Sequence, residues 1–292
     1  MKTKRRRGDR FDATLIRDLD SMHFFMPKVL PNRCDNEAYL SEQIDLTNLE
    51  AFLEKKNASQ PEYKYNLFQC IVTAMLKTVY LRPKMNRFIA NQELYQRNDV
   101  TAAFVVKKQF SDHAGEALAK VNALPEDTLE TVHQAIWKQI RLTRSETEKD
   151  STTDSMDKIS QWPIPRSWMR AFIRMIRALD QHGRVPRSLV ESEIFYSSAV
   201  ISNLGSIGLH AGYHHLTNWG TASVFVVIGE KKKRPYYDDD GNVTMKMSVD
   251  LGITVDERIA DGYYYAGTIR LLRKLLEEPE LLERPMNEEV AF

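Results

Sequence analysis

Polar and apolar residues alternate over two stretches of the chain, Ala38–Ile44 and Met245–Val255, and a further strand is expected over Val100–Lys107. Such alternation predicts β-strands that bury one face. A shorter apolar run, Ser223–Gly229, predicts a fully buried strand. The turn dipeptide Asp240-Gly241 lies between this run and the last alternating stretch, so a hairpin is expected there.

Helical periodicity occupies much of the remaining chain. It predicts helices over Asp12–Met26, from Thr47 onward, and over Asn66–Val79, Pro125–Arg144, Arg166–His182 and Tyr263–Leu276. Pro27 is expected to end the first of these helices, and Thr47 with Glu50 forms a capping box at the start of the second. The third is apolar nearly all round, so we expect it to be buried, with Cys70 as a small core residue.

The helix predicted at 166–182 carries an apolar stripe. Its members, spaced as on one helix face, are Trp168, Phe172, Met175, Ile176 and Leu179. Such a stripe could line a substrate pocket or lie on a membrane surface. Packing in the core or against another subunit is the commoner explanation, and we favour it.

Composition narrows the classes of partner. The 292 residues are 42% hydrophobic with a formal net charge of +1, which argues against a general polyanion binder, so no nucleic acid is expected. The first ten residues form a basic arm containing Lys2, Lys4, Arg5, Arg6, Arg7 and Arg10. It could touch phosphate, but no aromatic residue interleaves the charges, and we favour a flexible, solvated tail over residues 1–10.

The chain shows no secretory signal and no long apolar run. A cytoplasmic protein with no membrane partner is therefore expected. The two cysteines, Cys34 and Cys70, form no pair with metal-ligand spacing, so no metal site is predicted.

The candidate chemistry lies near the end of the chain, in Asp256-Glu257-Arg258-Ile259-Ala260-Asp261-Gly262. A predicted strand leads into this cluster and a predicted helix follows it, which places side chains at the lip of a sheet. The stretch resembles the D-H-R-x-x-D-G signature of the acyltransferase subunits of 2-oxo acid dehydrogenase complexes, whose relatives include chloramphenicol acetyltransferase. Glu257 stands where that family has its catalytic histidine.

Other segments resemble the same family in the same order. The matching segments are Glu42–Leu49, Arg82–Phe88, Ala199–Gly208, Ser223–Gly229 and Pro279–Leu282, whereas 110–193 matches poorly. The resemblance implies an α/β fold, a two-layer α+β sandwich whose mixed sheet carries helices mainly on one face. Residues 11–292 would form a single catalytic domain without lipoyl or subunit-binding domains, and a neighbour's strand would close a six-stranded sheet.

The resemblance also implies acyl transfer between coenzyme A and a thiol or hydroxyl acceptor. In the family a histidine removes the acceptor's proton, a serine donates to the oxyanion, and an aspartate pairs with an arginine. On this chain the serine role falls on Ser202 and the aspartate role on Asp261, with Arg17 as its partner. Gly262 would allow close packing, and the base position is Glu257.

A glutamate is a poor substitute for that base. Its ordinary pKa of ~4.3 is far below that of a thiol, ~8.5, unless burial raises it. Alternatively His214 or His215 is the base and Glu257 orients it, although histidines satisfied by packing are commoner. Pairing of Glu257 with Arg258 would instead indicate a silent site.

Three functions remain open on the sequence. The first is a coenzyme A-dependent acyltransferase with a non-standard base. The second is a catalytically silent scaffold or regulatory relative, and the third is a small-molecule binding protein that reuses the acyl channel. Retention of Ser202 favours the first. The resemblance implies a homotrimer or a multiple of trimers, in which Ser202 of one chain faces Glu257 of another.

Overall fold

A mixed six-stranded sheet forms the centre of the computed structural model, which describes residues 5–107, 116–144 and 165–292. The strand order is β2 (Glu37–Asp45), β9 (Val243–Asp256), β8 (Val224–Tyr237), β7 (Ala199–Asn203), β5 (Val100–Lys107) and β6 (Glu116–Ala123). Strand β7 runs parallel to both of its neighbours, and the other pairs are antiparallel. A small antiparallel sheet stands beside it, built from β1 (Ala13–Leu15), β4 (Glu93–Arg97) and β3 (Arg87–Ala90).

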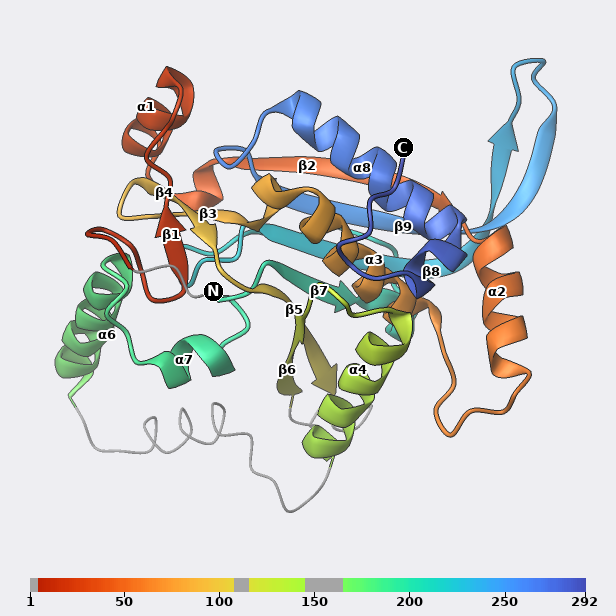
Figure 1. Cartoon of the computed structure of the whole chain (residues 1–292), viewed down its shortest axis with the longest axis horizontal. Coiled ribbons are helices and arrows are strands. Elements are labelled where there is room, and N and C mark those ends of the chain that lie inside the picture. The colour runs from red at the N-terminus through yellow and green to blue at the C-terminus, as the bar shows by residue number, and fades with distance from the viewer. Residues whose placement is uncertain (1–4, 108–115, 145–164) are drawn as a thin grey trace.

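Helices cover one face of the large sheet. The covering helices are α2 (Thr47–Asn57), α3 (Leu67–Leu81), α4 (Leu129–Arg144) and α8 (Gly262–Glu277). At one end of the molecule lie α1 (Ser21–Val29), α6 (Arg166–Gln181) and α7 (Arg187–Ser192), and the β8–β9 hairpin projects at the other (Figure 1). The expected mixed sheet with helices mainly on one face is confirmed. All six of its strands come from this chain, so the expectation that a neighbour's strand completes the six is wrong.

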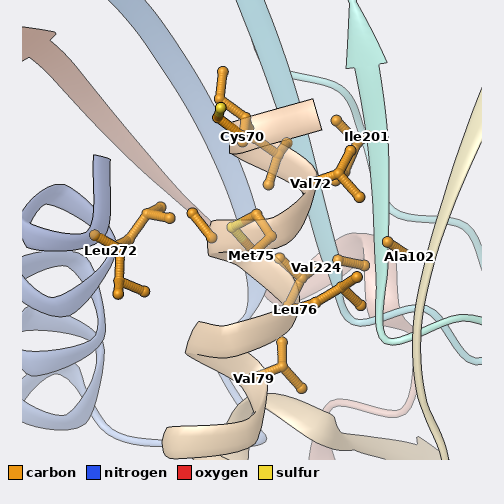
Figure 2. Packing of buried hydrophobic residues seen from close by; sticks show 14 of the residues in the cluster. Cys70, Val72, Met75, Leu76, Val79, Ala102, Ile201, Val224 and Leu272 are labelled. Carbon is orange, nitrogen blue, oxygen red and sulfur yellow. The ribbon is translucent and has the colours of Figure 1, made fainter. Parts of the chain in front are cut away.

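Helix α3 is the centre of the core. Asn66 and Gln69 cap it reciprocally, each side chain accepting from the backbone of the other. Figure 2 shows its apolar side chains between α8 and the sheet strands. Cys70 is fully buried, as the sequence predicted, and burial raises the pKa of its thiol to about 12.

The opposite face of the sheet, here called the open face, is covered by extended chain instead of helices. Val200, Phe225 and Val227 point to it and pack with Leu216 from the segment 209–216. This segment passes so close to the strands that a Cβ on Gly252 would lie 2.0 Å from the carbonyl oxygen of Gly212. Glycine is therefore required where the segment crosses β9.

The predicted strands and most predicted helices lie where the sequence placed them, whereas β1, β4 and β6 were not predicted, and three helix starts need correction. The first predicted helix, Asp12–Met26, is wrong. Residues 13–15 pair with β4 instead, and α1 starts after Asp20, whose carboxylate accepts from the His23 amide, and continues through Pro27. Local periodicity missed a pairing with a strand about eighty residues away.

The other two corrections concern caps. The Thr47–Glu50 capping box is wrong, because Asp45 accepts from the Thr47 amide and Glu50 binds Lys231. Helix α4 begins at Leu129 rather than Pro125. Four residues earlier the chain is still in a turn, closed by the Asp127 carboxylate accepting from the Leu124 amide.

The basic N-terminal arm and the apolar stripe of residues 166–182 also differ from expectation. Arg10 is buried and bound to Asp12 and Asp180, so it is part of the fold; residues 1–4 of the basic arm lie outside the described chain. Core packing of the 166–182 stripe is wrong for most of its members. Ile176 and Leu179 pack against the body, whereas its other three members are exposed.

We predict that Gly252→Ala destabilises the fold by about 1–3 kcal/mol, because the new methyl group collides with the backbone of the crossing segment. The matched control is Gly212→Ala, where no atom lies within 4 Å of the new Cβ. Urea unfolding of both variants measures the difference. Equal midpoints would contradict the close crossing.

Candidate functional site

Strand β9 delivers the 256–262 cluster to the edge of the sheet, where a buried ion network fixes it. The Asp256 carboxylate is fully buried and accepts from Arg258 at 2.8 Å (Nε) and 2.7 Å (Nη2). Arg33 Nε lies 3.6 Å from the same carboxylate, and the Tyr265 hydroxyl donates to the Asp256 carbonyl at 2.8 Å. The network therefore closes the turn between β9 and α8.

The two arginines use their remaining donors on backbone carbonyls. Arg258 binds the carbonyls of Leu30 and Pro31, after α1. The carbonyl partners of Arg33 are Thr217, Gly220 and Ile89. Burial lowers the pKa of Arg33, and the neighbouring Asp256 opposes that shift. One carboxylate thus organises four segments of the chain.

Glu257 lies at the first position beyond the strand ladder and is exposed. Its amide donates to the Asn36 carbonyl at 2.9 Å, which turns its side chain away from the core. Across the described residues, its carboxylate has no hydrogen-bond or ion-pair partner. Arg258 is fully engaged with Asp256, so the Glu257–Arg258 pair considered from sequence does not form within the chain.

Asp261 is the N-cap of α8. Its Oδ1 accepts from the Tyr264 amide at 2.8 Å, and Lys84 Nζ lies 3.8 Å from Oδ2. The Tyr264 amide, helped by Lys84, lowers the pKa of Asp261. The expected Arg17 partner is wrong for this chain, because Arg17 binds Asp9 at 2.9 Å instead.

Gly262 begins α8, and a Cβ there would meet no atom within 4 Å. The close packing that the family resemblance implies for this glycine is therefore absent within the single chain.

Ser202 and His214 lie on the open face. Ser202 pairs with Val227 and follows Val200 in the alternation of β7, so its side chain points to that face, half-buried. His214 stacks on Phe225, two residues before Val227, with 4.1 Å between ring centroids. In the part of the chain that is described, the Ser202 hydroxyl makes no hydrogen bond, so it is free to donate to a ligand.

His214 also contacts its neighbour, and the structure does not bring either histidine to Glu257. The two imidazoles stack at 4.5 Å, and His214 Nδ1 lies 2.9 Å from the His215 carbonyl oxygen. Along the sheet, Ser202 is level with Gly252, since both pair with Val227. Glu257 lies five residues further along β9, about 17 Å at the usual rise per residue. Ser202 and Glu257 of one chain therefore do not form a common site.

A groove of about 660 Å³ adjoins the end of β7. Its floor is the glycine turn after Ser202, in which Asn203 Oδ1 accepts from the Ser206 amide and Gly208 has φ +75°. Its wall is apolar and comes from Leu49, Leu53 and Phe68 of the α2–α3 region. Sequence reasoning found the turn but not this wall, because the wall comes from residues more than 130 positions away.

A second cavity, of about 650 Å³, lies between α4 and the loop before α3. Tyr63 stacks on Trp137 at 4.4 Å, and Tyr65 stacks on His133 at 4.0 Å. Tyr65 borders both cavities. Nothing in the sequence motifs pointed to it.

Among the described residues, no group of three or more His, Cys, Asp and Glu side chains is placed to hold a metal ion. No helix among them has the length and apolar character needed to cross a membrane.

Comparison with known proteins supports the sequence resemblance. The family model for the catalytic domain of 2-oxoacid dehydrogenases acyltransferase matches residues 168–283. Comparison with curated proteins gives no match.

Solved structures share the fold. A probable dihydrolipoamide acetyltransferase from Listeria monocytogenes 4b F2365 superposes with a TM-score of 0.57 at 11% identity, covering 91% of this chain and 95% of its own. The dihydrolipoamide acetyltransferase of Azotobacter vinelandii gives 0.56 at 15% identity, with 91% and 93% covered. A chloramphenicol acetyltransferase gives 0.53 at 10% identity, with 91% and 98% covered. The matched segment is therefore similar to an acyltransferase catalytic domain, and the chain shares the fold of these structures.

We predict that Asp256→Ala costs about 3–5 kcal/mol of unfolding free energy, because it leaves buried guanidinium groups without their carboxylate. The matched control is Asp250→Ala, which removes a partly exposed partner of Arg234 and should cost less than about 1 kcal/mol. Chemical denaturation measures both. Similar losses would show that the network does not hold the turn.

Proposed function

We propose that the protein transfers an acyl group between a coenzyme A thioester and a thiol or hydroxyl acceptor. The observation that carries this proposal is the unpaired Ser202 hydroxyl on the open face, at the end of β7 beside a groove of about 660 Å³. A free, accessible donor at such a position is available to an oxyanion.

The groove suits the thioester arm of coenzyme A. It has an apolar wall on α2 and α3, and it adjoins the Asn203–Gly208 turn, whose backbone could bind the arm's own amide groups. Lys231 lies at its rim, paired with Glu50. Asn203, the residue after Ser202, lines the groove, whereas the Ser202 side chain points to the opposite face of the sheet, so the acyl end of the arm would have to pass the end of β7 to reach the serine.

The reaction would proceed by direct transfer. A base removes the acceptor's proton while the acceptor attacks the thioester carbon. Ser202 donates to the oxyanion of the tetrahedral intermediate. Collapse of the intermediate breaks the carbon–sulfur bond, and the proton passes from the base to the leaving thiolate of coenzyme A.

We infer that the base is completed by a neighbouring subunit, in a trimer. Glu257 is exposed, unpaired and about 17 Å along the sheet from Ser202 of its own chain. Val29, beside the Leu30 carbonyl that binds Arg258, is 71% exposed, an apolar rim that a second subunit would cover. Across such an interface Glu257 would orient His214 or His215 of the neighbour, and the histidine would be the base.

The comparison protein from Azotobacter vinelandii supports the assignment by spacing. A serine, a histidine and an asparagine have roles in its catalytic mechanism, and its asparagine follows the histidine by four positions. Asp261 follows Glu257 by the same interval.

A silent relative is the second candidate, favoured by one observation. Glu257 is exposed and has no histidine partner among the described residues, and an exposed carboxylate is a weak base toward a thiol. A protein that binds coenzyme A without turnover would have the same groove. Activity measurements separate these functions.

We predict that Ser202→Ala lowers kcat for coenzyme A thioester turnover about 10²–10³-fold while leaving coenzyme A affinity within about threefold of wild type. Glu257→Gln should lower kcat at least about tenfold, and Glu257→His should retain or raise it by placing an imidazole at the base position. Turnover assays and calorimetric titration with coenzyme A test this. Binding without turnover by the wild-type protein would support the silent alternative.

A second prediction tests the shared site. If Ser202 and Glu257 come from different subunits, mixed trimers of Ser202→Ala and Glu257→Gln chains contain intact sites at about a quarter of the interfaces. Equal amounts of the two inactive variants, unfolded and refolded together, should therefore recover about a quarter of wild-type activity. Light scattering should show a trimer or a multiple of it. If verified mixed trimers recover no activity, then either Ser202 and Glu257 act within the same subunit or at least one of them is not part of the site.

A further inference from the structure

Four cationic side chains gather between the end of α3 and the first turns of α8. Arg82 follows α3, Lys84 and Arg87 come next along the chain toward β3, and Arg270 is on α8. The Tyr264 ring lies among them, with its centroid 3.7 Å from Arg82 Cζ and 5.0 Å from Lys84 Nζ. We call these four residues the cation cluster.

Arg82 and Arg270 reach the same point on the surface of α8. A Cβ on Gly267 would lie 3.1 Å from Arg82 Nη2 and 3.7 Å from Arg270 Nη2, so the two nitrogens lie within about 7 Å of each other. The glycine lets a guanidinium group rest against the helix backbone. Two like charges this close repel each other unless an anion lies between or beside them.

The partners of these two arginines are neutral. Arg82 donates to the Tyr264 carbonyl at 2.9 Å and to the Thr268 hydroxyl at 3.3 Å. Its Nη1 donates to nothing within the described chain. Arg270 is exposed, and no hydrogen bond or ion pair of its side chain occurs among the described residues. The donors that face outward are therefore available to a ligand.

The other two members add charge that is only partly balanced. Lys84 Nζ lies 3.8 Å from an Asp261 oxygen. Arg87 is half-buried and donates to the Gln96 amide oxygen at 3.4 Å. Burial lowers the pKa of Arg87, and the nearby Tyr264 opposes that shift. Over the described ranges, Asp261 is the one carboxylate that pairs with any member of the cluster.

We propose that the cation cluster binds a phosphate group, either as free inorganic phosphate or as the monoester of a small molecule. Arg82 Nη1 and the Arg270 guanidinium would donate to its oxygens, while Lys84 and Arg87 would contribute charge. Guanidinium groups suit this ligand, because their planar sets of donors match the oxygen geometry of phosphate.

The cation cluster is separate from the groove assigned to coenzyme A. Leu67 and Phe68, in the first turn of α3, line that groove, whereas Arg82 follows the last turn. The 15 residues of α3 span about 22 Å. The inference therefore goes beyond acyl transfer and does not depend on it.

A carboxylate of an acidic peptide is the competing ligand. It carries one negative charge and two acceptor oxygens, whereas a phosphate monoester carries close to two charges and three acceptor oxygens. The cluster has four positive charges against the one of Asp261. Charge complementarity therefore favours phosphate.

The test is calorimetric titration of the full-length protein with inorganic phosphate and with glycerol 3-phosphate, at constant ionic strength. We expect one saturable site for each ligand. Arg270→Gln should weaken binding about 10-fold or more, because it removes a charge-assisted donor without removing any contact of the fold. Arg270→Lys should lose less, since it keeps the charge. The matched control is Arg177→Gln, at another exposed arginine without an ion pair in the described chain, and it should not change the affinity.

Thermal unfolding gives a second readout. Phosphate should raise the Tm of the wild-type protein and of Arg177→Gln, and it should raise the Tm of Arg82→Gln and Arg270→Gln much less. The proposal is overturned if no saturation occurs up to about 10 mM phosphate, or if Arg177→Gln weakens binding as much as Arg270→Gln. It is also overturned if acetate binds as tightly as phosphate, or if a hexaglutamate peptide binds more tightly, which would assign the cluster to an acidic partner.

Discussion

The ion network of Asp256 is the constraint on which the rest of the site depends. A buried carboxylate with two buried arginines is costly unless most of their donors find acceptors. Here the carbonyls of Leu30, Ile89 and Thr217 supply part of that requirement, so four segments must meet at one point. This explains how the D-x-R part of the signature persists with a glutamate between its two charged residues. Those two residues are structural, and they do not report on the chemistry at position 257.

The second organising feature is the close approach of the segment 209–216 to the sheet backbone, on the open face. The 209–216 segment replaces a helix there, passing over β8 and β9 at Gly229 and Gly252. Because the cover is a single extended strand of chain, Ser202 at the edge of this face keeps an accessible hydroxyl. A helical layer of the kind formed by α3 would have buried it. The asymmetry between the two faces thus separates the part of the molecule that supplies stability from the part that offers chemistry.

The sequence predicted the periodic parts of this structure and missed the long-range ones. Strands β2 and β9 and helices α3 and α8 follow from patterns that burial imposes locally. The direction in which the Glu257 side chain points could not be predicted, because strand pairing ends at Asp256 and alternation no longer fixes the next side chain. The role of Arg33 was invisible for a different reason. Its carboxylate partner stands more than 220 positions away, and one sequence carries no trace of such a pairing.

The order of the strands has a consequence for synthesis of the protein. In the described sheet β2 pairs with β9 alone, so Glu37–Asp45 has no strand partner until Val243–Asp256 has been made. At the usual rates of translation that interval is about 10–40 s. Strand β7 likewise needs both β5 and β8 before it is enclosed. A nascent chain therefore holds an unpaired edge for most of its time on the ribosome, and the sheet closes only as the last sixth of the polypeptide emerges.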